Sequence, residues 1–226
     1  MLSKIVADVA TAVAGIPDGA TVLIGGFGIA GQPMALVDGL LEQGARDLTI
    51  VSNNAGNAET GIARLLAEGR VRKMVCSFPR QVDSWVFDGL YRDGKVELEV
   101  VPQGNLAERI RAGGAGIGGF FTPTGAGTIL AEGKETREID GRVYVLESPI
   151  RGDAALLGAY RGDRLGNLVF RKTSRNFNPV MATAATLTIA SVDHIAEVGT
   201  LDPEAVVTPG IYVDRVVEVG PRQWLA

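Results

Sequence analysis

The chain has 226 residues, of which 46% are hydrophobic and 21% charged, a composition that excludes a disordered protein and fits a full hydrophobic core. A net charge of −4 provides no basic field for phosphate backbones and argues against a nucleic-acid partner. Cys76 is the single cysteine and His194 the single histidine, which excludes an intrachain disulfide and leaves too few ligands for a thiolate and imidazole metal site.

The N-terminal segment predicts a helix over residues 3–14, with Ser3 as its N-cap and apolar residues at helical spacing. It lacks the uninterrupted apolar core of a signal peptide. No apolar run in the chain approaches the roughly 20 residues that span a bilayer. We therefore expect a cytoplasmic protein that makes no membrane contact.

A strand, a glycine turn and a helix start follow in residues 18–33, DGATVLIGGFGIAGQP. The aliphatic run 21–24 predicts a strand, and apolar spacing over residues 33–43 predicts a helix that Gly44 ends. Glycines at this junction tolerate positive φ and let a ligand approach the backbone. A helix N-terminus that follows such a turn offers free N–H groups to an anionic or polarised group.

The next segments continue to alternate between strand and helix. This order predicts right-handed crossovers on a mainly parallel sheet, in which ligands gather at the carboxyl ends of the strands. The predicted strands are 47–51, 72–77 and 96–101, and the predicted helices are 61–68, 84–93 and 105–112. The polar turn 52–57, the turn 78–81 and Gln103 then lie at these carboxyl ends.

The second half begins with a glycine-rich segment, 113–127, that shows no periodicity and predicts a functional or mobile loop. Two Gly-Asp pairs, at 152–153 and 162–163, predict hairpin turns between short strands. We expect one α/β domain over residues 1–226, a three-layer α/β/α arrangement with a mainly parallel central sheet and a more antiparallel second half. The remaining predicted elements are strands at 142–146, 168–170, 186–190 and 215–219 and a helix at 179–185.

Gly26, Gly28 and Gly31 have the spacing of a dinucleotide-binding turn and follow a predicted strand. That fold also needs an acidic residue about 20 positions later, to bind the ribose hydroxyls. Here the second strand ends in Ser52-Asn53-Asn54, which lacks the charge. A dinucleotide-binding oxidoreductase therefore remains an alternative, but the sequence lacks the acidic residue that this fold needs at the end of the second strand.

The chain offers no convincing nucleophile of its own. It contains no Gly-x-Ser-x-Gly motif, His194 lies in an ordinary strand context, and Cys76 lies in an apolar strand that predicts a buried, inert thiol. What remains is a set of uncharged donors at strand ends: the backbone of residues 25–28, Asn53, Asn54 and Gln103. Such donors can stabilise an oxyanion, although turn asparagines can also merely satisfy backbone groups.

Long motifs over nearly the whole chain resemble the A-type chain of the class I CoA-transferases. They are GGFGIAGQP (25–33), VSNNAGN (51–57), PQGNLAERIRAGGAG (102–116), FFTPTGAGT (120–128), EGKETREIDG (132–141) and GNLVFRKTSRNF (166–177). Within the family, residues 71–110 are most similar to enzymes that act on 3-oxoadipate. Acetoacetate and other 3-oxo acids are the alternative acceptors, and a noncatalytic binding role for the chain is a further alternative.

The resemblance implies transfer of CoA from succinyl-CoA to a 3-oxo acid through a glutamyl-CoA thioester. The reactive glutamate of the family belongs to a B subunit, in a Glu-Asn-Gly motif that this sequence lacks. The implied partner is that B subunit, in a heterodimer or heterotetramer. The implied ligand is a CoA thioester as substrate, with no permanently bound cofactor and no metal.

The resemblance also assigns site residues. It implies that Gln103 is the oxyanion-hole glutamine. Two arginines in turns, Arg80 and Arg151, can pair with the distal carboxylate of a dicarboxylate acceptor, and a surface salt bridge is the alternative for each. Members of the family commonly carry aromatic residues at the positions of Ala126 and Ala154, so a changed acceptor pocket is expected. The residues implied to border the cleft are Gly25, Gly26, Phe27, Gly28, Asn53 and Asn54.

Overall fold

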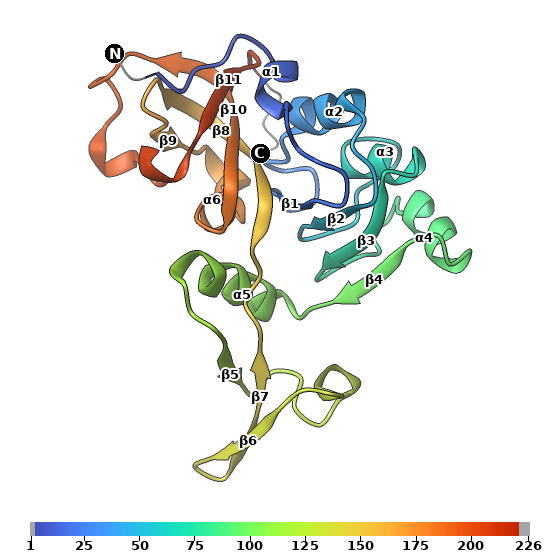
Figure 1. The fold of residues 1–226 in the computed structure, drawn as a ribbon. Coiled ribbons are helices and arrows are strands. Elements are labelled where there is room, and N and C mark those ends of the chain that lie inside the picture. Colours follow the sequence, from blue (N-terminus) through green and yellow to red (C-terminus); the bar gives the residue numbers. More distant parts are fainter. Residues whose placement is uncertain (1–2, 222–226) are drawn as a thin grey trace.

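The computed structural model describes residues 3–221, and its main feature is a long parallel sheet (Figure 1). The strands lie in the order β11-β10-β8-β1-β2-β3-β4, every neighbouring pair is parallel, and β9 adds to β8 in the antiparallel direction. Their bounds are β1 Thr21–Ile24, β2 Leu48–Val51, β3 Val71–Cys76, β4 Glu97–Val100, β8 Gly152–Asp163, β9 Leu168–Val169, β10 Ala185–Ala196 and β11 Arg215–Glu218.

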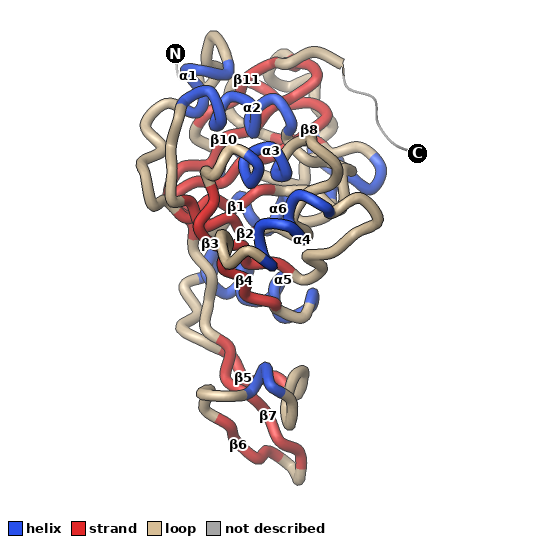
Figure 2. Tube along the Cα trace, turned by 90° about the vertical axis from the view of Figure 1, so that its right-hand side faces the viewer, coloured by secondary structure: helices blue, strands red, loops and turns tan. Residues whose placement is uncertain are grey.

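Helices cover both faces of this sheet, which confirms the three-layer prediction. Val22 and Ile24 of β1 point into a core shared with α1 to α4, whereas Leu23 points into a second core with α5 and α6, as the two-residue period of a strand requires. Figure 2 shows α2, α3 and α4 in front of the strands. The helices are α1 Val9–Val13, α2 Met34–Gln43, α3 Ile62–Ala67, α4 Trp85–Arg92, α5 Gln103–Ala115 and α6 Asn178–Ala182. None of the helices within residues 3–221 has the length and apolar character needed to cross a bilayer.

A second, small antiparallel sheet extends away from the main one, at the bottom of Figures 1 and 2. Its order is β5-β7-β6, with bounds Phe120–Thr122 for β5, Thr136–Ile139 for β6 and Arg142–Glu147 for β7. The more antiparallel character expected of the second half is found here and at β9. Val145 and Glu147 are the buried residues of its three strands. Short 3₁₀ turns complete the chain at Ile129–Ala131, Lys172–Arg175, Pro203–Ala205 and Gly210–Tyr212.

Three local predictions were wrong. The Gly152-Asp153 pair forms no hairpin, because it begins β8, a 12-residue strand that lies between β1 and β10 in parallel register. The segment that follows, AALLGA, is buried on both faces, which is typical of a parallel strand. The first helix is shorter than expected, since Asp8 and not Ser3 caps it, and α5 continues three residues into the glycine-rich segment. The hairpin predicted at Gly162-Asp163 is confirmed, because it leads into β9.

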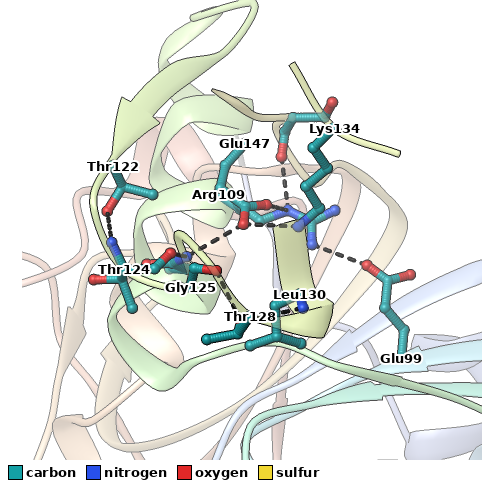
Figure 3. Close-up of polar contacts among 11 residues, drawn as sticks. Glu99, Arg109, Thr122, Thr124, Gly125, Thr128, Leu130, Lys134 and Glu147 are labelled. Atoms are coloured by element: carbon teal, nitrogen blue, oxygen red, sulfur yellow. Dashed lines mark hydrogen bonds and ion pairs between the residues drawn. The ribbon is translucent and has the colours of Figure 1, made fainter. Parts of the chain in front are cut away.

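Five charged side chains join the main sheet, α5 and the small sheet, and Figure 3 shows four of them, Glu99, Arg109, Lys134 and Glu147. Glu99 of β4 accepts hydrogen bonds from Lys73 of β3 at 2.6 Å and from Arg109 of α5 at 2.9 Å. The buried Glu147 of β7 accepts from Lys134 at 2.8 Å, and its carboxylate lies 3.8 Å from Arg109. The arrangement fixes the small sheet against α5 through paired charges, the form in which charge is tolerated away from water.

This cluster predicts a stability contribution that depends on pH. Burial opposes ionisation of Glu99, but Lys73 and Arg109 outweigh it and hold the pKa of its carboxyl below the ordinary value. The contribution is therefore complete above the unfolded pKa of about 4.3 and is lost as pH falls through the lower folded pKa. We expect Glu99→Gln to lower the free energy of unfolding near neutral pH, with the two proteins converging as pH falls through the folded pKa of Glu99.

Urea unfolding at several pH values measures this convergence. Glu97→Gln is the matched control, since Glu97 lies on the same strand but forms an exposed pair with Arg72 at 3.3 Å, and such pairs contribute little. A Glu99→Gln protein with wild-type stability at every pH would show that the cluster does not stabilise the fold.

Candidate active site

A cleft of about 540 Å³ lies at the carboxyl ends of β2, β3 and β4, where the sequence places its polar turns. It has one wall from the glycine turn after β1 and another from the first residue of α5. All eight lining side chains are uncharged, so the cleft suits a reaction controlled by hydrogen-bond donors more than by fixed charge. They are Phe27, Asn53, Asn57, Ser77, Phe78, Gln81, Val82 and Gln103.

Gln103 is the first residue of α5 and is exposed to the cleft. Pro102 is the N-cap residue of α5, with φ −49 and ψ 137, and its carbonyl accepts the first helical hydrogen bond, from Leu106 N at 2.8 Å. The amide of Gln103 donates to Oδ1 of Asn53 at 2.7 Å, so the structure brings these two predicted residues together. Asn105 does not begin the helix as expected; its amide contacts Glu147 of the small sheet at 3.2 Å.

The two turn asparagines have different environments. Asn53 is 1% exposed and lines the cleft, and its carbonyl accepts from the backbone of Ser77 and of Phe78. Asn54 is fully buried, accepts from Gly56 N at 2.9 Å and donates to the carbonyl of Gly28 at 3.3 Å. Asn54 therefore satisfies the backbone of two turns, the alternative left open for these residues, and Asn53 remains the candidate at the site.

The glycine turn is a fixed wall of the cleft, with few free donors. Gly25 N–H donates to the carbonyl of Leu156, Gly26 N–H to Oδ1 of Asn176, and Phe27 N–H to the carbonyl of Ala30. Among the predicted donors 25–28, only the N–H of Gly28 forms no hydrogen bond within the described residues. Phe27 contributes its half-exposed ring to the cleft.

Two asparagines that sequence reasoning missed hold this wall. Asn176 donates to the carbonyl of Ala30 at 3.0 Å. Asn178 donates to the carbonyl of Gly31 at 3.1 Å and accepts from Gly158 N at 2.9 Å. Both belong to a segment about 150 residues from the turn, so no local pattern signals the contact. Ser77, in contrast, directly follows β3, and the rule that sites form at carboxyl ends could have found it.

The two arginines lie at opposite edges of the sheet. Arg80 is next to Gln81 of the cleft, and its Nε donates to Asp88 at 3.0 Å while its side chain stays 70% exposed. Arg151 precedes β8, at the amino edge, and packs beside Gly113. Gly113 is ten helical residues beyond Gln103, about 15 Å along the axis. Ala154 lies at this amino edge too, buried in the core.

Neither Cys76 nor His194 lines the cleft. Cys76 is fully buried, and burial raises the pKa of its thiol to about 12, so the thiolate does not form near neutral pH. His194 lies on β10, edge-on to the ring of Tyr160. Among residues 3–221, no three His, Cys, Asp or Glu side chains are placed to hold a metal ion.

Comparison with known proteins identifies the family of the chain. Residues 6–219 match the model of the Coenzyme A transferase family. The chain belongs to this family. The glycine turn with dinucleotide spacing is thus part of a CoA-transferase chain.

The chain is similar over almost its full length to A subunits of CoA-transferases. It is 65% identical to the A-type chain of 3-oxoadipate CoA-transferase from Pseudomonas putida, over 97% of this chain and 95% of that one. It is 51% identical to the A-type chain of succinyl-CoA:3-ketoacid coenzyme A transferase from Xanthomonas campestris, over 95% of this chain and 88% of that one. The chain is accordingly the A-type chain of a CoA-transferase.

A solved structure shares the fold. An acyl-CoA transferase of Escherichia coli O157:H7, in a thioester complex with CoA, superposes with a TM-score of 0.87 at 25% identity and covers 99% of this chain. This chain spans 48% of that one, about half its length.

The packing of Asn178 against Gly25 can be tested directly. A Cβ at Gly25 would overlap with Oδ1 of Asn178, so we expect Gly25→Ala to destabilise the chain by about 1–3 kcal/mol. The substitution should cost less when Asn178→Ala has already removed the obstacle, and thermal unfolding of the four proteins of this cycle measures the difference.

Gly28→Ala is the control for this cycle. Gly28 has φ 61 and no atom within 4 Å of an added Cβ, so its cost comes from backbone strain alone and does not depend on Asn178. Equal costs of Gly25→Ala in both backgrounds would contradict the packing account.

Proposed function

We propose that this chain, together with a B subunit, transfers CoA from succinyl-CoA to 3-oxoadipate in the cytoplasm, where CoA thioesters are available. The single observation that carries the site assignment is the Gln103 amide, held at the mouth of an uncharged cleft by Asn53. The acceptor is supported by the 65% and 62% identity to the A-type chains of two 3-oxoadipate CoA-transferases.

In the proposed reaction, a glutamate that the B subunit contributes attacks the thioester carbonyl of succinyl-CoA. The C–S bond breaks, giving an acyl-glutamyl anhydride and CoA thiolate. The thiolate then attacks the glutamyl carbonyl and releases succinate, which leaves a glutamyl-CoA thioester. The acceptor carboxylate and the returning thiolate repeat these two exchanges in reverse and free the glutamate. No step consumes an oxidant, a reductant or a net proton.

Each exchange passes through a tetrahedral intermediate whose carbonyl oxygen carries negative charge. The Gln103 amide donates to this oxygen, and because the amide does not titrate, it serves every exchange in the same state. The cleft also carries three apolar side chains, Phe27, Phe78 and Val82, all of them exposed in this chain. In this reaction the present chain supplies the hydrogen-bond donors and the B subunit supplies the nucleophile.

Gln103→Ala is expected to lower the turnover of the purified heteromer by about 10²–10³-fold, the usual cost of one oxyanion donor. Gln103 is exposed on the first turn of α5, so assembly with the B subunit should persist, as size-exclusion chromatography would show. Unchanged turnover in an intact complex would favour the noncatalytic alternative for this chain.

The second carboxylate of 3-oxoadipate calls for a cation, and Arg80 is the arginine beside the cleft. Asp88 contacts only its Nε, so the two terminal nitrogens remain available for a bidentate pair with a carboxylate. Arg80→Gln should raise KM for 3-oxoadipate about tenfold and leave KM for acetoacetate, which has no second carboxylate, unchanged.

Arg151→Gln is the matched control, because Arg151 lies at the opposite edge of the sheet and should affect neither acceptor. Steady-state kinetics with both acceptors give the comparison. A wild-type preference for acetoacetate would overturn the proposed acceptor and keep the CoA-transferase assignment, whereas equal effects of Arg80→Gln on both acceptors would exclude its role in specificity.

A further inference from the structure

Ser77 lies in the cleft with its hydroxyl against the residue that holds Gln103. Its Oγ is 3.0 Å from Oδ1 of Asn53 and 3.1 Å from the carbonyl oxygen of the same residue. Oδ1 of Asn53 in turn accepts from the amide of Gln103 at 2.7 Å. The side-chain oxygen of Asn53 thus receives two donors, Ser77 from the end of β3 and Gln103 from the turn after β4.

We infer that Ser77 is a positioning residue for the reaction, acting through Asn53 on the direction of the Gln103 amide. The inference rests on the proposed function, because it assigns Ser77 to the same oxyanion donor. Ser77 takes no direct part in the chemistry: its single hydroxyl proton is directed to Asn53, and no titratable side chain is among the described hydrogen-bond partners of its Oγ.

The physical reason is that the side-chain amide of Asn or Gln rotates easily about its terminal torsion. The terminal torsions of Asn and Gln are broad and two-fold, so a hydrogen bond is needed to select one direction. Gln103 is exposed, with a long side chain that its own packing does not restrain. Asn53 is the rigid member of the pair, because it is buried and its carbonyl is held by the N–H groups of Ser77 and Phe78.

Removing the hydroxyl leaves Asn53 Oδ1 with a single donor and releases its torsion. The Gln103 amide then follows Asn53, and its donor moves away from the position that the oxyanion will occupy. Since misplacement of a group by about 1 Å can cost up to 10²-fold, an indirect contact of this kind is sufficient to change turnover. Binding of succinyl-CoA should change little, because the loss falls on the transition state.

The test uses the complete heteromer and a double-mutant cycle. Ser77→Ala should lower kcat for succinyl-CoA about tenfold with KM nearly unchanged, and the same substitution should have no further effect in Gln103→Ala. Ser77→Thr and Ser77→Val form a matched pair, because the two side chains have the same shape and differ in the hydroxyl. We expect Thr to retain turnover and Val to lose it.

The control is Ser191→Ala. Ser191 is a buried serine on the distant strand β10, and its hydroxyl donates to the carbonyl of Leu157 on β8 at 3.2 Å. The thermal stability of this variant is compared with that of Ser77→Ala, and its turnover should equal that of the wild type. Two results would overturn the inference. One is that Ser77→Ala lowers turnover by the same factor in the wild-type and Gln103→Ala backgrounds, and the other is that the Thr and Val variants have equal turnover. A wild-type complex that transfers CoA to no 3-oxo acid would instead overturn the proposed function.

Discussion

The hydrogen bond between Gln103 and Asn53 joins two turns that are 50 residues apart, and the site depends on it. The bond forms because β2, β3 and β4 are neighbours in a parallel sheet, so that their carboxyl ends meet at one edge. Ser77, at the end of the middle strand, lies between the two. A change of order among these three strands would separate the donors, whereas changes elsewhere in the sheet would leave them together.

The opposite wall is rigid for a different reason. Gly25 has no side chain, and the space that a Cβ would need is filled by Asn178, which bonds the glycine turn to Gly158 of β8. The turn therefore positions Phe27, and most of its own N–H groups form hydrogen bonds within the chain. An uncharged wall with few free donors suits an enzyme in which one amide, and not a glycine nest, contacts the developing charge.

The first half of the sheet and the placement of Gln103 and Asn53 could be predicted because they depend on local signals: apolar runs, helix ends and the strand-end rule. The Gly152-Asp153 pair shows the limit of such signals, since the same dipeptide ends a strand at Gly162 and begins one at Gly152. The roles of Asn176 and Asn178 could not be predicted, because their partners lie about 150 residues earlier. Arg151 has the right chemistry for a carboxylate, but only the sheet order reveals that it lies at the other edge.

The small sheet also contacts the elements that form the cleft. Asn105, two residues after Gln103, contacts Glu147 of β7, and the chain then passes directly into β8, whose Gly158 is bonded to Asn178. The continuous segment formed by β7 and β8 therefore contacts the first turn of α5 through Asn105 and the glycine turn through Asn178. The two contacts come from consecutive strands, β7 for Asn105 and β8 for Asn178, so the small sheet is joined to both walls of the cleft through one stretch of chain. The small sheet thus belongs to the mechanical support of the cleft even though none of its residues lines it.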